Sequence, residues 1–224
     1  MHTVLHVSLE YQYGIGGLKT VMNGLLPALE ENGVNISVIT PYYDFIQHNP
    51  GFKLEQLATI NHLYKKILHT SLIFRVENSK IQNITTIQHY LIKPNINSPV
   101  EQIFNVGNAQ NIYKAFNESE PQNRLEYFNG AISSFIRIST PNIPSFDIVH
   151  THTWHTSLSI CLIKEFEQLN WIKSNSNLQL KSIPKIISTV HLLSNEQGLL
   201  VGKREIVDTL QSRVTIRFKI FNRS

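Results

Sequence analysis

Histidine is the residue most able to do chemistry in this 224-residue chain, which holds ten of them. Three lie close together in the run HTHTWH, as His150, His152 and His155, and His191 follows a later apolar run. Each place is one where a buried strand is predicted to end, and open α/β sheets bind ligands at the carboxyl ends of their strands. A neutral imidazole both donates and accepts a hydrogen bond, which suits a sugar hydroxyl. The histidines therefore predict a polar ligand at this edge of the sheet.

His155 is expected to begin a helix, where the helix dipole lowers the pKa of its imidazole and favours the neutral form. We predict a functional role for this residue. His150 and His152 share one face of the predicted strand, and for them the alternative is that they pack beside the sheet without contacting a ligand.

The same run has the spacing H-x-H-x-x-H, which resembles the metal-binding run of metallo-β-lactamase-like hydrolases. Imidazoles suit zinc. That family usually has Asp directly before the last histidine, whereas this chain has Trp154, and Asp147 is the only aspartate nearby. A His-rich metallohydrolase is thus the less favoured alternative, and we expect no bound metal.

A glycine-rich loop near the N-terminus is the second candidate site. Gly14, Gly16 and Gly17 separate the apolar run at residues 4–8 from a helical pattern. Such a loop lets backbone N–H groups approach an anion such as phosphate at a helix N-terminus. A nicotinamide dinucleotide is not predicted, because Lys19 stands where G-x-G-x-x-G needs its third glycine. The simpler alternative is that the glycines only allow the strand and the helix to pack tightly.

The elements that position these residues follow from hydrophobic periodicity. Buried strands are predicted at residues 4–8, 34–40, 146–151 and 185–190, and helices at 18–29, 100–116, 124–138 and 156–169. The aromatic residues of the two middle helices are expected in the core. Residues 72–76 and 85–92 predict antiparallel strands or a β-hairpin, inserted after an irregular stretch at 44–61. This order predicts an α/β fold: a single Rossmann-like, doubly wound and mostly parallel sheet.

Composition fits a globular protein, since 42% of the residues are hydrophobic. No apolar run approaches the roughly 20 residues of a membrane-spanning helix, and the N-terminus lacks a signal-peptide pattern. The lone cysteine, Cys161, lies among apolar residues and is expected in the core of a protein from a reducing compartment. We therefore expect a cytoplasmic protein with no membrane partner.

The formal net charge of +4 arises at one end of the chain. Residues 203–224 hold six Lys and Arg against two Asp and Glu, and the remainder is balanced. A basic terminal segment is usually a solvated surface. We expect no nucleic-acid partner.

Several motifs together resemble the starch/glycogen synthase family of retaining, family 5-like glycosyltransferases, specifically the N-terminal half of its two-domain GT-B fold. The family's K-x-G-G-L, D-V-V-H-x-H-D-W-H and T-I-H-N-x-x-Y-Q-G motifs have counterparts here, as does its N-R-x-x-x-F-N/S-x-A helix. The matching residues are 14–18, 26–29, 40–43, 123–131, 147–155 and 189–198.

The resemblance implies transfer of glucose from a nucleotide sugar, typically ADP-glucose, to an α-1,4-glucan, with retention and without a metal or other cofactor. It implies that His155 contacts the transferring glucose. It also implies that the donor is bound by the glycine loop and by further residues of the cleft: Glu10, Gly14, Gly16, Gly17, His191, Gln197 and Gly198.

This chain departs from the family at position 14, which is Gly in place of the donor-binding Lys, and at position 153, which is Thr in place of Asp. We expect residues 1–202 to form the N-terminal GT-B domain and residues 203–224 a basic tail, the truncated start of the next element. The C-terminal GT-B domain is then absent, so we expect an isolated chain that is incomplete as an enzyme and acts with a separately encoded C-terminal half. The alternative is a non-catalytic glucan-binding or regulatory domain, or a degenerate remnant.

Overall fold

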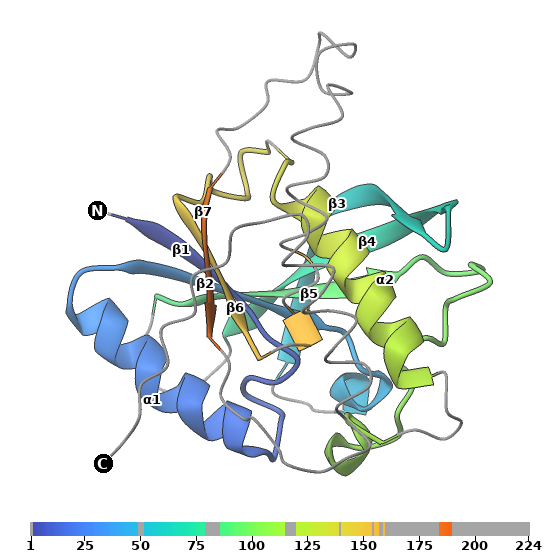
Figure 1. Ribbon diagram of the computed structural model, residues 1–224, viewed down its shortest axis with the longest axis horizontal. Coiled ribbons are helices and arrows are strands. Elements are labelled where there is room, and N and C mark those ends of the chain that lie inside the picture. The colour runs from blue at the N-terminus through green and yellow to red at the C-terminus, as the bar shows by residue number, and fades with distance from the viewer. Residues whose placement is uncertain are drawn as a thin grey trace, which may run out of the picture.

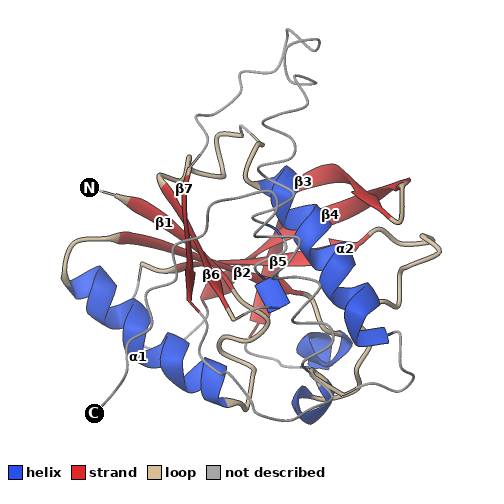
Figure 2. Ribbon diagram, in the orientation of Figure 1, coloured by secondary structure: helices blue, strands red, loops and turns tan. Residues whose placement is uncertain are grey.

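The computed structural model describes residues 2–48, 52–78, 86–114, 120–138, 140–153, 155–156, 159 and 184–189. These residues form one seven-stranded sheet with the strand order β3-β4-β5-β2-β1-β6-β7 (Figure 1). Strands run through the centre of the molecule, with the helices α1 and α2 on either side (Figure 2). The predicted α/β class, with a Rossmann-like and mostly parallel sheet, is confirmed.

The parallel part of the sheet contains β5 (Gln88–Pro94), β2 (Asn35–Pro41), β1 (Thr3–Val7), β6 (Ile148–His152) and β7 (Lys185–Thr189). β1 and β2 are buried along almost their whole length, which explains their nearly continuous apolar sequences. β1 lies between β2 and β6. The residues that follow β1 and β6 therefore emerge side by side at the carboxyl edge.

The helix α1 (Gly17–Glu31) follows β1 directly and covers one face of the sheet. Its buried side chains Leu18, Met22 and Leu26 share a cluster with Ile36 and Val38 of β2. The helix ends at Asn32, and Gly33 adopts a φ of 79°, which a glycine accepts without strain.

The opposite face of the sheet is covered by α2 (Glu120–Phe135), which confirms the helix predicted at 124–138 within a few residues. Phe128, Ile132 and Phe135 are fully buried in the larger core cluster, together with Leu5 and Val7 of β1. Adjacent residues of a strand point to opposite faces of the sheet. Leu5 and Val7 face α2, whereas Ile36 and Val38 face α1, so the two helices cover opposite faces. This is the doubly wound arrangement that was predicted.

The antiparallel strands predicted at 72–76 and 85–92 are present, because β4 (Ile67–Asn78) pairs antiparallel with β5, which also pairs in parallel with β2. The tight hairpin itself is formed by β3 (Phe52–Tyr64) and β4, and β3 is the strand that was not predicted. The stretch at 44–61, predicted as irregular, forms the short 3₁₀ helix η1 (Asp44–His48) and much of β3. The two-residue turn is made by Lys65 and Lys66 at φ values of 49° and 65°. Such turns favour Asn-Gly, so a Lys-Lys pair gave no turn signal.

The prediction of a helix at 100–116 is wrong for the described residues of that stretch. Residues 100–114 form turns with one short 3₁₀ helix, η2 (Ala109–Asn111). The Asp44 carboxylate accepts hydrogen bonds from the N–H groups of Val106 and Gly107, and Gly107 has a φ of 76°. These contacts fix a looped backbone. Phe104 is buried as predicted, whereas Tyr113 is 43% exposed.

Several predictions fall on residues outside the described part of the chain. They concern Cys161, most of the helix at 156–169, His191, Gln197, Gly198 and the basic tail at 203–224. Among the described helices, none is long and apolar enough to cross a membrane.

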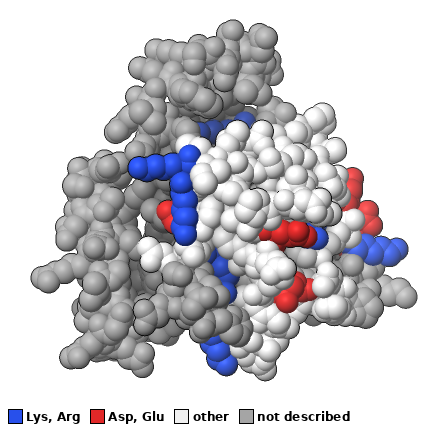
Figure 3. Space-filling model, turned by 90° about the vertical axis from the view of Figure 1, so that its right-hand side faces the viewer, with Lys and Arg blue, Asp and Glu red and all other residues white. Residues whose placement is uncertain are grey.

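The surface drawn in Figure 3 carries charges of both signs. Lys and Arg side chains and Asp and Glu side chains stand apart among uncharged residues, and the described part of this face shows no large patch of one sign (Figure 3). One ion pair of described residues joins Arg75 of β4 to Glu55 of β3.

Candidate active site

The Glu10 side chain lies inside the glycine loop, three residues after β1 ends. It is 1% exposed, and its Oε2 accepts a hydrogen bond of 2.9 Å from the Gly16 N–H. A Cβ at Gly14 would lie 2.2 Å from Glu10 Oε2, and one at Gly16 would lie 2.7 Å from Oε1. Gly17, in contrast, has nothing within 4 Å of an added Cβ. A side chain at position 14 would also meet the Glu10 Cβ at 2.6 Å, whereas at position 16 only the carboxylate end of Glu10 would have to shift. The loop backbone therefore wraps a carboxylate of the same chain most tightly at Gly14.

Tyr113 connects Glu10 to the other end of the site. Although part of the Tyr113 residue is exposed, its phenol group is largely buried, which raises the pKa of the phenol; the charge of Glu10 and a side-chain hydrogen bond with Glu10 raise this pKa further. The phenol consequently stays protonated beside the Glu10 carboxylate. The Tyr113 ring also lies 5.4 Å from the His155 ring, centroid to centroid. Sequence reasoning missed this residue, because no pattern distinguishes it within a stretch predicted as a core helix.

His155 follows the sharp turn that ends β6. Thr153 has a φ of 67° in this turn, and its Oγ1 lies within hydrogen-bonding distance of His155 Nδ1, at 2.9 Å. Burial lowers the pKa of the His155 imidazole from 6.5 to about 4, so the ring is neutral at pH 7. This direction agrees with the predicted neutral form, but burial, rather than the predicted helix dipole, lowers the pKa of His155. Residues 155 and 156 have the helical backbone that was predicted here.

The backbone of His155 is held by Asn129, a fully buried residue of α2. Asn129 Nδ2 donates to the His155 carbonyl at 2.8 Å, and its Oδ1 accepts from the Ser159 N–H at 2.9 Å. An α-helix normally joins these two backbone groups directly, so the amide is inserted between them. The same Nδ2 donates to the Leu125 carbonyl at 2.7 Å. A helix on one face of the sheet thereby fixes the position of His155.

These contacts bring together four of the predicted site residues. Glu10, Gly14 and Gly16 form one side, and His155 forms the other, with Tyr113 between them. Gly17 begins α1, whose first turn contains no acidic side chain and whose N-cap makes no side-chain hydrogen bond. The remaining predicted residues, His191, Gln197 and Gly198, lie outside the described part.

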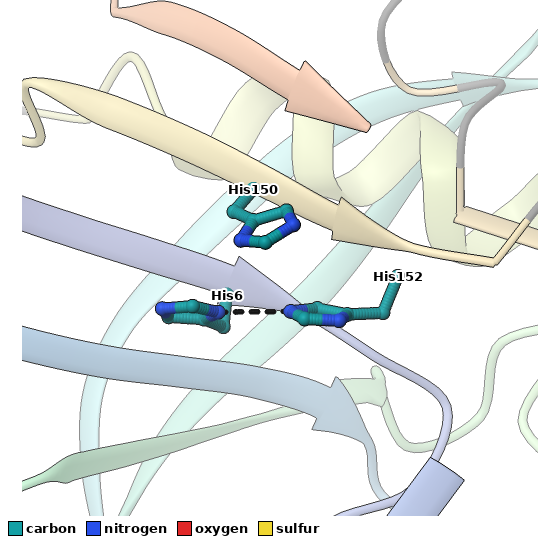
Figure 4. A group of neighbouring side chains, drawn as sticks. All are labelled: His6, His150 and His152. Atoms are coloured by element: carbon teal, nitrogen blue, oxygen red, sulfur yellow. Dashed lines mark hydrogen bonds between the residues drawn. The ribbon is translucent and has the colours of Figure 1, made fainter. Parts of the chain in front are cut away.

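His150 and His152 belong to a different group, in which the third member is His6 of β1 (Figure 4). The ring nitrogens of these three side chains lie within 4.8 Å of one another. Among the described residues, the H-x-H-x-x-H cluster of the less favoured metallohydrolase alternative does not form, since His155 turns toward Tyr113 and Thr153 instead. Sequence reasoning had not connected His6 with the later histidines.

Comparison with known proteins decides the family of this chain. The model of the starch synthase catalytic domain matches residues 3–194. The chain belongs to this family. The resemblance inferred from the motifs is thereby confirmed, and the match includes Glu10, the glycine loop, Tyr113 and His155.

Three glycogen synthases show what share of a relative's length this chain covers. That of Desulfitobacterium hafniense is 28% identical over 153 residues, which are 67% of this chain and 28% of the relative. That of Streptococcus mutans is 28% identical over 179 residues, or 79% of this chain and 31% of the relative. That of Bacillus cereus is 25% identical over 193 residues, or 81% and 36%. The chain thus spans about a third of the length of these curated relatives.

Proposed function

We propose that this chain forms the N-terminal half of a glucosyltransferase that moves glucose from ADP-glucose to the end of an α-1,4-glucan. The observation that carries the proposal is the joining of Glu10, Tyr113 and His155 at the carboxyl edge of the sheet. Open α/β sheets bind ligands at this edge. The family match and the glycogen synthase relatives support the choice of glucan and nucleotide sugar.

In this proposal His155 orients the transferring glucose. Its neutral ring is oriented by Thr153 at Nδ1 and by Asn129 at the backbone, and a neutral imidazole can both donate and accept a hydrogen bond to a sugar hydroxyl. Burial makes such a hydrogen bond stronger than it is in water. The contribution to rate is one of positioning, because a fixed partner removes part of the entropic cost of aligning donor and acceptor.

The lack of a cation at position 14 and at His155 supports a second half that supplies positive charge. The leaving diphosphate is stabilised by cations and by oriented backbone donors. At position 14, the space that a side chain would need holds the Glu10 carboxylate, and His155 is neutral. The N–H groups in the first turn of α1 are suited to an anion, but they are only partial charges. We therefore assign the cations to a C-terminal half that completes the site. We further propose that the reaction takes place in the cytoplasm.

The test is reconstitution. The chain is assayed alone, mixed with the C-terminal half of the Bacillus cereus glycogen synthase, and fused to that half, by incorporation of [14C]glucose from ADP-[14C]glucose into glycogen. We expect transfer by the fusion and none by either half alone. A fusion that binds ADP yet transfers no glucose, beside an active intact B. cereus enzyme, would overturn the proposal. UDP-[14C]glucose in parallel tests the choice of nucleotide.

A non-catalytic glucan-binding domain is the second candidate function. The observation in its favour is that the Glu10 carboxylate occupies the space beside position 14. The catalytic proposal requires a cation at that place to stabilise the leaving diphosphate. It predicts retardation of the chain in glycogen-containing native gels together with an inactive fusion. Retention without transfer would decide for this candidate.

A further inference from the structure

Three imidazoles gather on one face of the sheet, on strands that are neighbours in space and far apart in sequence. His6 of β1 is paired in register with His150 of β6, and His152 lies two residues further along the same strand. Residues at i and i+2 of a strand point to the same face, so all three side chains lie together. The ring centroids are 5.1 Å apart for His6 and His150, 5.1 Å for His6 and His152, and 4.2 Å for His150 and His152.

The nitrogens of this cluster are already close to the spacing of metal ligands. His6 Nδ1 and His152 Nε2 lie 2.8 Å apart, joined by the dashed line in Figure 4, and the His150 ring lies beside both. With Zn–N bonds of about 2.0 to 2.1 Å, two ligands of a tetrahedral ion stand roughly 3.4 Å apart. An ion would therefore need the His6 and His152 rings to part by only about half an ångström.

The surroundings fix the position of these rings. His6 and His152 are fully buried. The Thr189 hydroxyl lies 2.7 Å from His150 Nε2, a contact of the type that orients the rings of metal-ligating histidines.

Packing alone accounts poorly for the cluster. His6 Nε2 is buried and makes no hydrogen bond within the described part of the chain. A buried polar atom without a partner costs free energy that an apolar side chain at this position would not. Packing alone therefore does not explain a histidine at position 6; its other ring nitrogen, Nδ1, is the one that lies beside His152.

We propose that His6, His150 and His152 bind one divalent ion of the zinc class, which cross-links β1 to β6. Three imidazole ligands suit zinc, cobalt, nickel and copper. His150 is partly exposed, so a water molecule can reach the ion on that side and serve as its fourth ligand. The site is separate from the candidate active site, where His155 contacts Tyr113. The proposal does not rest on the proposed glucosyl transfer.

The test is metal titration of the purified, EDTA-treated full chain, with Zn²⁺ followed by calorimetry and Co²⁺ by its visible absorption. We expect one ion per chain, the intense visible bands of tetrahedral Co²⁺, and a rise in Tm on adding Zn²⁺, because a ligand of the folded state stabilises it. Thr189→Val, which keeps all three ligands, should weaken binding by about tenfold to a hundredfold. His150→Gln should weaken it at least as much.

The matched control is His2→Gln, which removes an exposed histidine outside the cluster. It should leave the affinity for both ions unchanged. Wild-type chain that binds no stoichiometric metal would overturn the proposal, whatever the variants do. Binding that Thr189→Val and His150→Gln leave unaltered, or that His2→Gln abolishes, would overturn it equally.

Discussion

Replacing Asn129 tests whether α2 holds His155 in place. In Asn129→Ala, the His155 carbonyl and the Ser159 N–H both lose their partner, at 2.8 and 2.9 Å. Each buried group left unsatisfied costs about 1–3 kcal/mol, and a direct bond between the two groups can recover part of this. We therefore expect the free energy of unfolding to fall by about 2–4 kcal/mol.

Asn129→Asp separates the two halves of the interaction. It keeps an oxygen that accepts from Ser159 N–H, but it places a second oxygen against the carbonyls of His155 and Leu125, where Asn129 donates. At pH 7 we expect at least the loss seen for Asn129→Ala, because the carboxylate has no proton to donate. Part of the loss should return at low pH, where the protonated acid can donate.

Urea unfolding measures both variants, and the imidazole signals of His155 in NMR spectra report its position. The matched control is Asn23→Ala, an exposed asparagine on α1, which should change the unfolding free energy by less than about 0.5 kcal/mol. If Asn129→Ala unfolds at the same urea concentration as the wild type, with unmoved His155 signals, then α2 does not position this residue.

Three further predictions concern the same site. Gly14→Ala should destabilise the protein in urea unfolding because its Cβ meets Glu10, whereas Gly17→Ala, with open space, should be neutral or stabilise by up to about 1 kcal/mol; equal effects would contradict the loop geometry. Tyr113→Phe should lower the unfolding free energy by about 1 kcal/mol, since a hydrogen bond to a carboxylate is lost; an unchanged urea midpoint would contradict this contact. The pKa of His155, lowered to about 4, makes stability fall as pH drops below 6.5, because the unfolded chain binds the proton first; His155→Gln should show a smaller loss between pH 7.5 and 5.

The strand, glycine loop and helix at the N-terminus were predictable because their signals are local. Periodicity marks β1, α1 and β2, and Asn32 and Gly33 mark the helix end. β3 was missed because its turn uses Lys65 and Lys66 in a conformation that Asn and Gly usually adopt. The stretch at 100–114 has helical periodicity, yet its backbone is fixed by Asp44, more than 60 residues earlier.

The candidate site was predictable residue by residue but not in its contacts. Glu10, the glycines and His155 follow from strand ends and from the family motifs. The roles of Asn129 and Tyr113 depend on contacts with residues distant in sequence, which no local pattern reveals. The grouping of His6 with His150 likewise depends on the pairing of β1 with β6.

The most direct test of the central claim compares the fusion to the B. cereus C-terminal half with its His155→Ala variant, using transfer of glucose from ADP-[14C]glucose to glycogen. A lost hydrogen bond to the reacting sugar should lower kcat by about a hundredfold to a thousandfold. KM should change less, and the circular dichroism spectrum of the variant should match that of the parent. An active fusion whose His155→Ala variant transfers glucose at the same rate would contradict the assignment of this residue to the glucose.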